Sequence, residues 1–220
     1  SAALIVFLVA ACAGPLAGAD DASPAKAEPA SAAAPAAGDA KPAAAAASAP
    51  QAAYAVLLKD ATKLPGLIPL HRKDDKLYAE LSDSLLGKEF FVLTSIARGI
   101  GERSLLGGMS IGFGDDWVWQ FRKVDDTIQV VRRSVRFFAA QGSPESKAVD
   151  LAYTDSVLFS VKIAATSPSG GHVIDLAPIF LTDLPRLAAS LPGFSFARDR
   201  SNWGRIKAFP DNVELEVAAT

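Results

Sequence analysis

The chain has 220 residues, which is enough for one ordinary domain or for one domain with a tail. Its formal net charge is -2, and from Tyr54 onward acidic and basic residues are equal in number, which argues against a nucleic-acid partner. One cysteine and two histidines exclude an intrachain disulfide and a metal site built from two or more thiolates.

An apolar run, AALIVFLVAA, opens the chain from Ala2 to Ala11. It is too short to span a bilayer, which needs about 20 residues, and it matches the hydrophobic part of a secretory signal. The sequence therefore predicts that residues 1–19 are a truncated signal. The exported protein would reside in the periplasm or on the outer membrane, at the cell surface, or outside the cell.

Two processing sites fit this signal. Val9-Ala10-Ala11-Cys12 matches a bacterial lipobox, in which Cys12 is lipidated and anchors the chain to the outer membrane. The only cysteine falls at this position, which favours the lipobox over a chance residue in an apolar run. Ala17-Gly18-Ala19 instead fits ordinary signal peptidase cleavage, and the sequence leaves both open.

Residues 20–53 consist almost entirely of Ala, Pro, Ser, Lys, Asp and Glu. Such a segment buries too little apolar surface to offset the loss of chain entropy on folding. Its closely spaced prolines also prevent a long helix. We therefore predict a disordered, semi-extended tether that holds the following domain away from a membrane.

Large aliphatic, aromatic and charged residues appear together from Tyr54 onward, and strand patterns predominate. We expect residues 89–97 to form a central strand buried on both faces, and the alternation around Asp125-Asp126 gives the clearest hairpin. The expected strands cover residues 67–72, 76–81, 89–97, 117–124, 127–133, 135–139, 156–165, 172–176, 203–209 and 213–217.

Helical patterns are short, at residues 54–63 and 183–191, with a single turn at residues 85–86 and a helical stretch within residues 143–153. No strand–long helix–strand alternation supports a parallel sheet. The sequence thus predicts a β-dominated α+β domain over residues 54–220. It would be built from antiparallel sheets or hairpins with two or three short helices, with a subdomain boundary near Gly142 as an alternative.

No catalytic or metal-binding residue can be assigned from motifs. Gly99-Ile100-Gly101 begins a dinucleotide fingerprint that Ser104 breaks. We expect His71 to be exposed beside a turn, and His172 to be structural or exposed. The carboxylate pairs are predicted to serve turns and to bind no ligand, because neighbouring residues on a strand point to opposite faces.

An aromatic stripe formed by Trp117, Trp119 and Phe121 is the one feature that suggests a binding surface, for peptide or glycan. The alternative, which large aromatic side chains usually favour, is packing in the core. The pattern itself fits both.

Several short motifs, in order, resemble the N-terminal region of large bacterial exported zinc-dependent metalloproteases of the Met-zincin type. The resemblance covers residues 67–217. It rests on Lys76-Leu77-Tyr78, Asp83-Ser84-Leu85-Leu86-Gly87-Lys88-Glu89-Phe90, Phe121-Arg122-Lys123-Val124, Val135-Arg136-Phe137, Thr154-Asp155-Ser156-Val157-Leu158, Val173-Ile174-Asp175-Leu176 and Phe180-Leu181-Thr182-Asp183-Leu184.

The resemblance implies a catalytic His-Glu-x-x-His helix in a later domain, where the zinc would be bound; this chain contains no such motif. We therefore expect a non-catalytic N-terminal domain whose partner is a downstream catalytic domain of the same protein. Two alternatives remain, a free-standing surface lipoprotein that binds peptide or glycan and a structural spacer.

Overall fold

A computed structural model describes residues 53–99, 106–111, 117–184, 186, 188, 191, 193 and 195–220, and the backbone of residues 2–10. Cys12, the Ala17–Ala19 cleavage site and the predicted tether up to residue 52 lie outside the described residues, as do parts of the glycine-rich loop and of the predicted helix 183–191. No helix among the residues it describes combines the length and apolar character needed to cross a bilayer.

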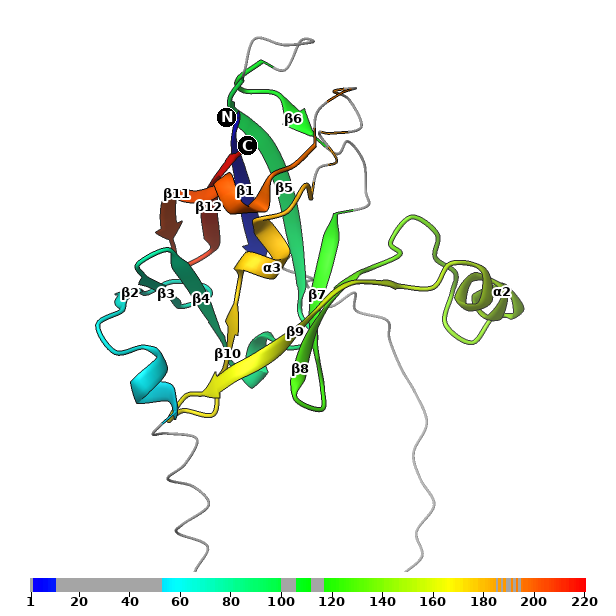
Figure 1. Cartoon of the computed structure of the whole chain (residues 1–220). Coiled ribbons are helices and arrows are strands. Elements are labelled where there is room, and N and C mark those ends of the chain that lie inside the picture. The colour runs from blue at the N-terminus through cyan, green and yellow to red at the C-terminus, as the bar shows by residue number, and fades with distance from the viewer. Residues whose placement is uncertain are drawn as a thin grey trace, which may run out of the picture.

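The fold is β-dominated with a few short helices, as the sequence predicts (Figure 1). All pairings between the strands are antiparallel. The strands are β1 (Ala2–Ala10), β2 (Thr62–Leu64), β3 (Leu70–Lys73), β4 (Lys76–Leu81), β5 (Glu89–Arg98), β6 (Ser110–Ile111), β7 (Val118–Val124), β8 (Thr127–Arg132), β9 (Ser156–Thr166), β10 (His172–Asp175), β11 (Asn202–Ala208) and β12 (Asn212–Ala219).

Helices are few and short among these residues. A helical turn covers residues 53–57, and 3-10 turns cover Asp83–Leu85 and Arg198–Arg200. The α-helices labelled in Figure 1 are α2 (Pro144–Ala152) and α3 (Ala177–Phe180). Gly87, which follows the turn at Asp83–Leu85, has a φ of 77°, the left-handed conformation that glycine adopts without strain.

The strands follow one path, β11-β12-β1-β5-β7-β8-β9-β10-β4-β3-β2, with β6 beside β5. The long strand β9 belongs to both halves of this path, because its first part pairs with β8 and its last part pairs with β10. The path curls until its ends meet. The Leu67 N–H donates to the Phe209 carbonyl at 2.7 Å, and the Arg72 guanidinium donates to the Gly204 carbonyl at 3.0 Å.

Gly66 permits this close approach of the two ends. A Cβ atom at this position would lie 2.8 Å from both the Ala208 Cβ atom and the Phe209 carbonyl oxygen. No real Cβ makes such contacts, and a backbone oxygen cannot move aside as a flexible side chain can. The close approach of the two ends of the path therefore depends on the absence of a side chain at residue 66.

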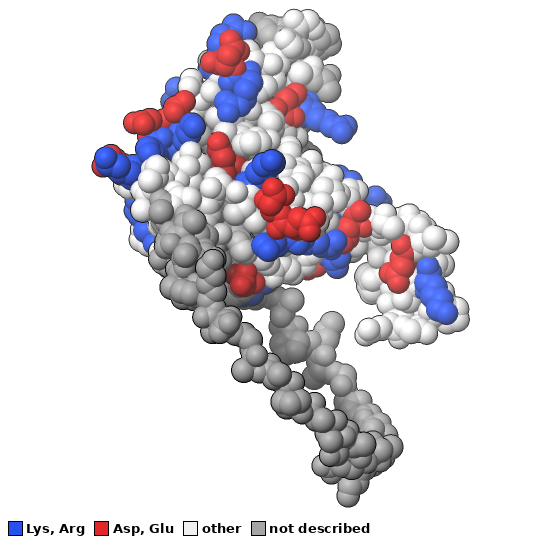
Figure 2. Space-filling view, turned by 60° about the horizontal axis from the view of Figure 1, so that its bottom comes forward, with Lys and Arg blue, Asp and Glu red and all other residues white. Residues whose placement is uncertain are grey.

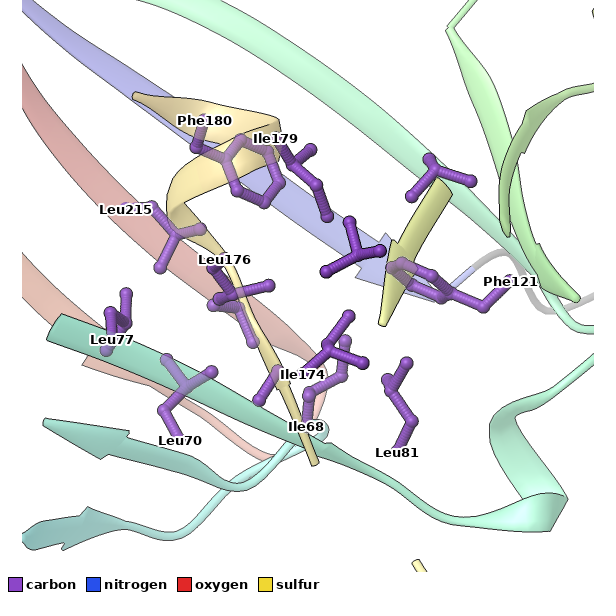
Figure 3. Packing of buried hydrophobic residues seen from close by; sticks show 14 of the residues in the cluster. Ile68, Leu70, Leu77, Leu81, Phe121, Ile174, Leu176, Ile179, Phe180 and Leu215 are labelled. Atoms are coloured by element: carbon purple, nitrogen blue, oxygen red, sulfur yellow. The ribbon is translucent and has the colours of Figure 1, made fainter. Parts of the chain in front are cut away.

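The core fills the space between the two halves of the curled sheet. Side chains of β3, β4 and β10 meet those of β12, β7 and α3 in one cluster, as Figure 3 shows for Leu70, Leu77 and Ile174 opposite Leu215 and Phe180. Trp119 and Phe121 on β7 are both buried in this cluster. Such burial is the main stabilising contribution in a domain of this size.

Two strand predictions were wrong in detail. β5 is buried on one face only, because Phe91 and Leu93 are 43% and 38% exposed while their neighbours Phe90 and Val92 are buried. Residues 135–139 form no strand. They belong to a segment over residues 133–155, here called the arm, which leaves the sheet after β8, carries α2 and returns as β9 (Figure 1).

The apolar run that the sequence predicts as a signal forms β1, which lies between β12 and β5. Its register with β12 pairs Ala2 with Ala219 and Val9 with Asn212. Residues that lie in this sheet cannot lie in a membrane at the same time. Export and lipidation at Cys12 stay predictions. Because both predicted processing sites follow β1 in the sequence, processing at either would remove β1 from the chain.

Candidate functional site: a projecting arm and its cleft

The arm projects from the body of the domain and ends in α2 (Figure 1). Ser143 caps α2 by accepting a hydrogen bond from the Ser146 N–H, and Pro144 occupies its first turn, so the local sequence specifies where the helix begins. However, no residue of α2 is buried. A helix of nine residues is marginal on its own in water, and α2 therefore lacks the packing that stabilises most protein helices.

Large apolar side chains lie on the surface of this arm. Phe138 is 89% exposed and Leu151 is 87% exposed, the two highest values among the large hydrophobic residues described. Phe137 and Tyr153 are partly exposed and stack on each other, with ring centroids 4.1 Å apart. Figure 2 shows acidic and basic side chains interspersed over the visible face of the molecule. Contiguous exposed apolar groups typically mark contact sites.

Ionic contacts fix the arm to the body at its base. Asp155 accepts hydrogen bonds from the Arg122 guanidinium at 2.5 Å, from the Arg133 guanidinium at 2.6 Å and from the Ser134 N–H at 3.1 Å. Arg133 also donates to Glu89 on β5 at 2.9 Å. The cluster thus joins β5, β7 and both ends of the arm through a carboxylate with several charge-assisted bonds.

These contacts lower the pKa of Asp155. Its partial burial alone would raise the pKa, but the hydrogen bonds from Ser134, Arg122 and Arg133 have the larger combined effect and favour the ionised carboxylate. The hydrogen bond to Glu89 raises the pKa of Arg133 and keeps this side chain cationic. Both arginines are already paired with carboxylates, so they do not form a free anion site.

We predict that Asp155→Ala loosens the arm from the body. The change removes the common acceptor of two arginines and one backbone N–H, yet these groups are near solvent, so we expect a loss of only about 1 kcal/mol in the free energy of unfolding. The larger effect should be faster trypsin cleavage after Arg136 and faster amide exchange over residues 134–153. Asp150→Ala on exposed α2 is the control, and equal cleavage of both variants would contradict the anchoring role.

The same anchor should be sensitive to acid. A carboxyl whose pKa is lowered in the folded state contributes stability above its ordinary pKa, and this contribution is lost as the pH falls through the lowered value. The arm of the unmodified chain should therefore become protease-sensitive below about pH 4, the ordinary range of aspartate. At neutral pH, the arm of the Asp155→Ala variant should already be as protease-sensitive as the arm of the unmodified chain is in acid.

An open cleft of about 540 Å³ lies between the arm and the sheet. Polar groups from Arg122, Arg133 and Asp155 form its floor, and Phe137, Phe138 and Tyr153 bring aromatic rings to it. Aromatic and polar groups that converge in one concave region are typical of ligand sites, although this cleft is open to solvent.

A second polar cluster lies around Glu80 on β4, on the face of the strand opposite to the side chains of Leu77, Ala79 and Leu81 in the main core. Its carboxylate accepts a hydrogen bond from the Tyr54 hydroxyl at 3.2 Å, lies 3.1 Å from His71 Nε2, and is 3.4 Å from the Ser169 hydroxyl. The prediction of an exposed His71 was wrong, because only 4% of this residue is exposed. His71 pairs with Tyr78 on the face of the sheet opposite to Leu70, and Tyr54 covers this face, with its ring 6.2 Å from the His71 ring. The pattern of neighbouring residues does not reveal this cover.

This cluster is not arranged as a catalytic triad. The carboxylate stands between the histidine and the serine, whereas nucleophilic catalysis needs the histidine in contact with the nucleophile. His172 is largely buried and contacts Asp83 at 3.1 Å, which agrees with a structural role. Within the described part of the chain, no three His, Cys, Asp or Glu side chains are grouped so as to hold a metal ion.

The aromatic stripe does not form a surface. Trp119 and Phe121 are buried in the core, where Trp119 stacks between Trp117 and Phe180 with centroid distances of 6.1 and 6.0 Å. Trp117 is half-buried at the edge of this cluster. The hypothesis that these three residues form a binding surface is therefore wrong, and packing in the core accounts for the aromatic stripe. Cys12 lies outside the described residues.

Comparison with protein-family models gives two matches. Residues 51–99 match a domain of unknown function, DUF5118, and residues 113–220 match a second one, DUF5117. The chain carries DUF5118 followed by DUF5117. Comparisons with curated proteins and with solved structures found no match.

The boundary between the two domains lies between β5 and β7, which are paired in the same sheet. DUF5118 supplies β2 to β5, and DUF5117 supplies β7 to β12 and the arm. The Glu89–Arg133 ion pair joins the two domains at the base of the arm. DUF5118 and DUF5117 thus share one core and one sheet.

Proposed function

We propose that this chain is a non-catalytic docking domain of an exported zinc-dependent metallopeptidase, and that its arm contacts the catalytic domain. The observation that carries the proposal is the exposed apolar surface of the arm, formed by Phe137, Phe138, Leu151 and Tyr153. A short helix with no buried residue gains its missing packing when a partner covers it.

The motifs that resemble the metalloprotease N-terminal region support this proposal. One of them supplies Arg122, another supplies Asp155, and these residues pair at the base of the arm. A third, Val135-Arg136-Phe137, lies on the arm itself. Zinc would be bound by the catalytic domain, and the part played by this chain would be to hold that domain in place or to shape access to its cleft.

The test uses two matched variants and the catalytic region of the same gene product, made as a separate polypeptide. We expect Phe138→Asp combined with Leu151→Asp to weaken binding at least 100-fold, because two anchor residues commonly contribute about 2 kcal/mol each. Val56→Asp is the control, since Val56 is also exposed and apolar but lies in the turn at residues 53–57, outside the arm. Equal binding of both variants, or the lack of a zinc-binding region in the gene product, would refute the proposal.

A second candidate function, peptide or glycan binding, is favoured by the cleft. The stacked pair of Phe137 and Tyr153 gives it an aromatic wall of the kind on which sugar rings and peptide side chains pack. Calorimetric titration with glycan and peptide panels tests it. Binding that Tyr153→Ala removes would support this function, and no heat from any ligand would exclude it for the panel tested.

A further inference from the structure

β1 is the only strand that joins β12 to β5 in the described sheet. Without β1, the hairpin of β11 and β12 would no longer be paired to the rest of the sheet. β5 and β12 would then each expose a row of backbone N–H and C=O groups. Such rows bind added strands readily. The position of β1 is therefore a slot for one extended segment, antiparallel to both neighbours.

The inner side of this slot requires apolar residues. Register positions 4, 6 and 8 of β1 lie opposite residues that are buried on both neighbouring strands, and directly paired residues of an antiparallel sheet share a face. These neighbours are Val92, Thr94 and Ile96 on β5, and Val213, Leu215 and Val217 on β12.

The outer side of the slot is acidic along β12. Positions 5 and 7 of β1 lie opposite Glu216 and Glu214, which reach Arg205 at 3.6 Å and Lys207 at 3.8 Å on β11. The chain's own residues at positions 5 and 7 are Ile and Phe. On the β12 side, a carboxylate opposite an apolar residue gains nothing, whereas a basic residue there would form a favourable cross-strand pair. On the β5 side, positions 5 and 7 lie opposite Ser95 and Leu93, which add no charge.

We propose that the slot between β5 and β12 is a strand-acceptor site. The preferred occupant is an extended segment of a partner protein that carries apolar residues at alternate positions and Lys or Arg between them. β1 fills the slot in the unprocessed chain, and the partner segment takes its place when β1 is displaced or is removed by processing at one of the two predicted sites. The acidic outer edge, set by Glu214 and Glu216, selects the occupant. This inference does not depend on the metallopeptidase proposal.

The covalent connection to the rest of the chain explains how β1 can hold the slot with an imperfect sequence. It keeps β1 at a local concentration of about a millimolar, so a free peptide at micromolar concentration does not compete. Cutting the tether removes this advantage. The exchange experiment should therefore use the full chain, folded first and cut afterwards.

A protease site is inserted between Gly38 and Asp39, and the folded chain is cut there and mixed with labelled nine-residue peptides. One peptide is the β1 sequence with Ile5→Lys and Phe7→Lys, and a second carries Ile5→Glu and Phe7→Glu. A third is the lysine peptide with Val6→Pro, which cannot complete the ladder. We expect the lysine peptide to displace the fragment with an apparent Kd about tenfold lower than that of the glutamate peptide. The proline peptide should not bind, and the uncut chain should take up none of the three.

Three results would overturn the proposal. Equal uptake of the lysine and glutamate peptides would remove the acidic selection. Retention of the original fragment against every peptide would show that the slot does not exchange. If the cut chain formed dimers, the occupant of the slot would be a second copy of this chain and not a partner protein. Hydrogen exchange on the uncut chain is the check on occupancy: Val6→Pro should speed exchange in β5 and β12, and unchanged exchange there would place β1 outside the sheet.

Discussion

Trp119→Ala is expected to lower the free energy of unfolding by about 3–5 kcal/mol, the largest effect of any single substitution considered for this chain. Trp119 has 0% exposure and packs against Phe159 on β9 and Phe180 on α3. These contacts join β7 to the strand shared by both halves of the sheet. Truncation leaves a cavity that the surrounding strands, fixed by their ladders, cannot close.

Urea denaturation followed by circular dichroism measures this loss. Phe138→Ala is the matched control, because it removes an aromatic ring of similar size from an exposed position, and we expect its effect to stay within about 0.5 kcal/mol. If the two variants lost similar stability, Trp119 would not lie in the core as described.

Glu80→Ala is expected to destabilise the domain by about 2–4 kcal/mol. Its carboxylate is the shared partner of the Tyr54 hydroxyl and of His71 within a buried cluster. Removing it leaves buried polar groups without an acceptor, and each such group costs about 1–3 kcal/mol. Glu80→Gln keeps one acceptor oxygen and should lose about half as much or less, so a loss equal to that of alanine would contradict the hydrogen-bond account.

The pH dependence of the Glu80 contribution has a definite sign. Burial raises the pKa of Glu80, but hydrogen bonds from the Ser167–Ser169 hydroxyl pair, His71 and Tyr54 together lower it below its ordinary value of 4.5. Its contribution to stability is therefore present above pH 4.5 and is lost as the pH falls through the lowered pKa. Comparing Glu80→Gln with the unmodified chain from pH 7 to pH 3 should show that their stabilities converge in acid.

Much of the sheet could be predicted because its strands carry their own signals. The alternation in 76–81 and the hairpin around Asp125-Asp126 correspond closely to β4 and the β7–β8 pair. Asp125 has a φ of 50° in that turn, which aspartate tolerates better than most residues. Local pattern and turn chemistry agree at these positions, so sequence reasoning succeeds.

The functional surface could not be predicted in the same way. Residues 135–139 are rich in Val and Phe and indicate a strand, but no neighbouring strand pairs with them. Whether an apolar run pairs, packs or stays exposed is decided by its tertiary surroundings. The opposite error at His71 has a tertiary cause as well, because Tyr54 covers the face of the sheet on which His71 lies. The role of Asp155 in anchoring the arm could not be predicted, because the residues that it contacts are distant in the sequence.

The central claim is that the arm is the surface through which this chain docks on a zinc-binding catalytic domain. The most direct measurement is hydrogen exchange on residues 1–220, alone and mixed with the zinc-binding region of the same gene product. We expect slower exchange over residues 134–153, including α2, with much smaller changes elsewhere outside the cleft. Protection that spares the arm, or no complex with a zinc-binding region, would contradict the claim.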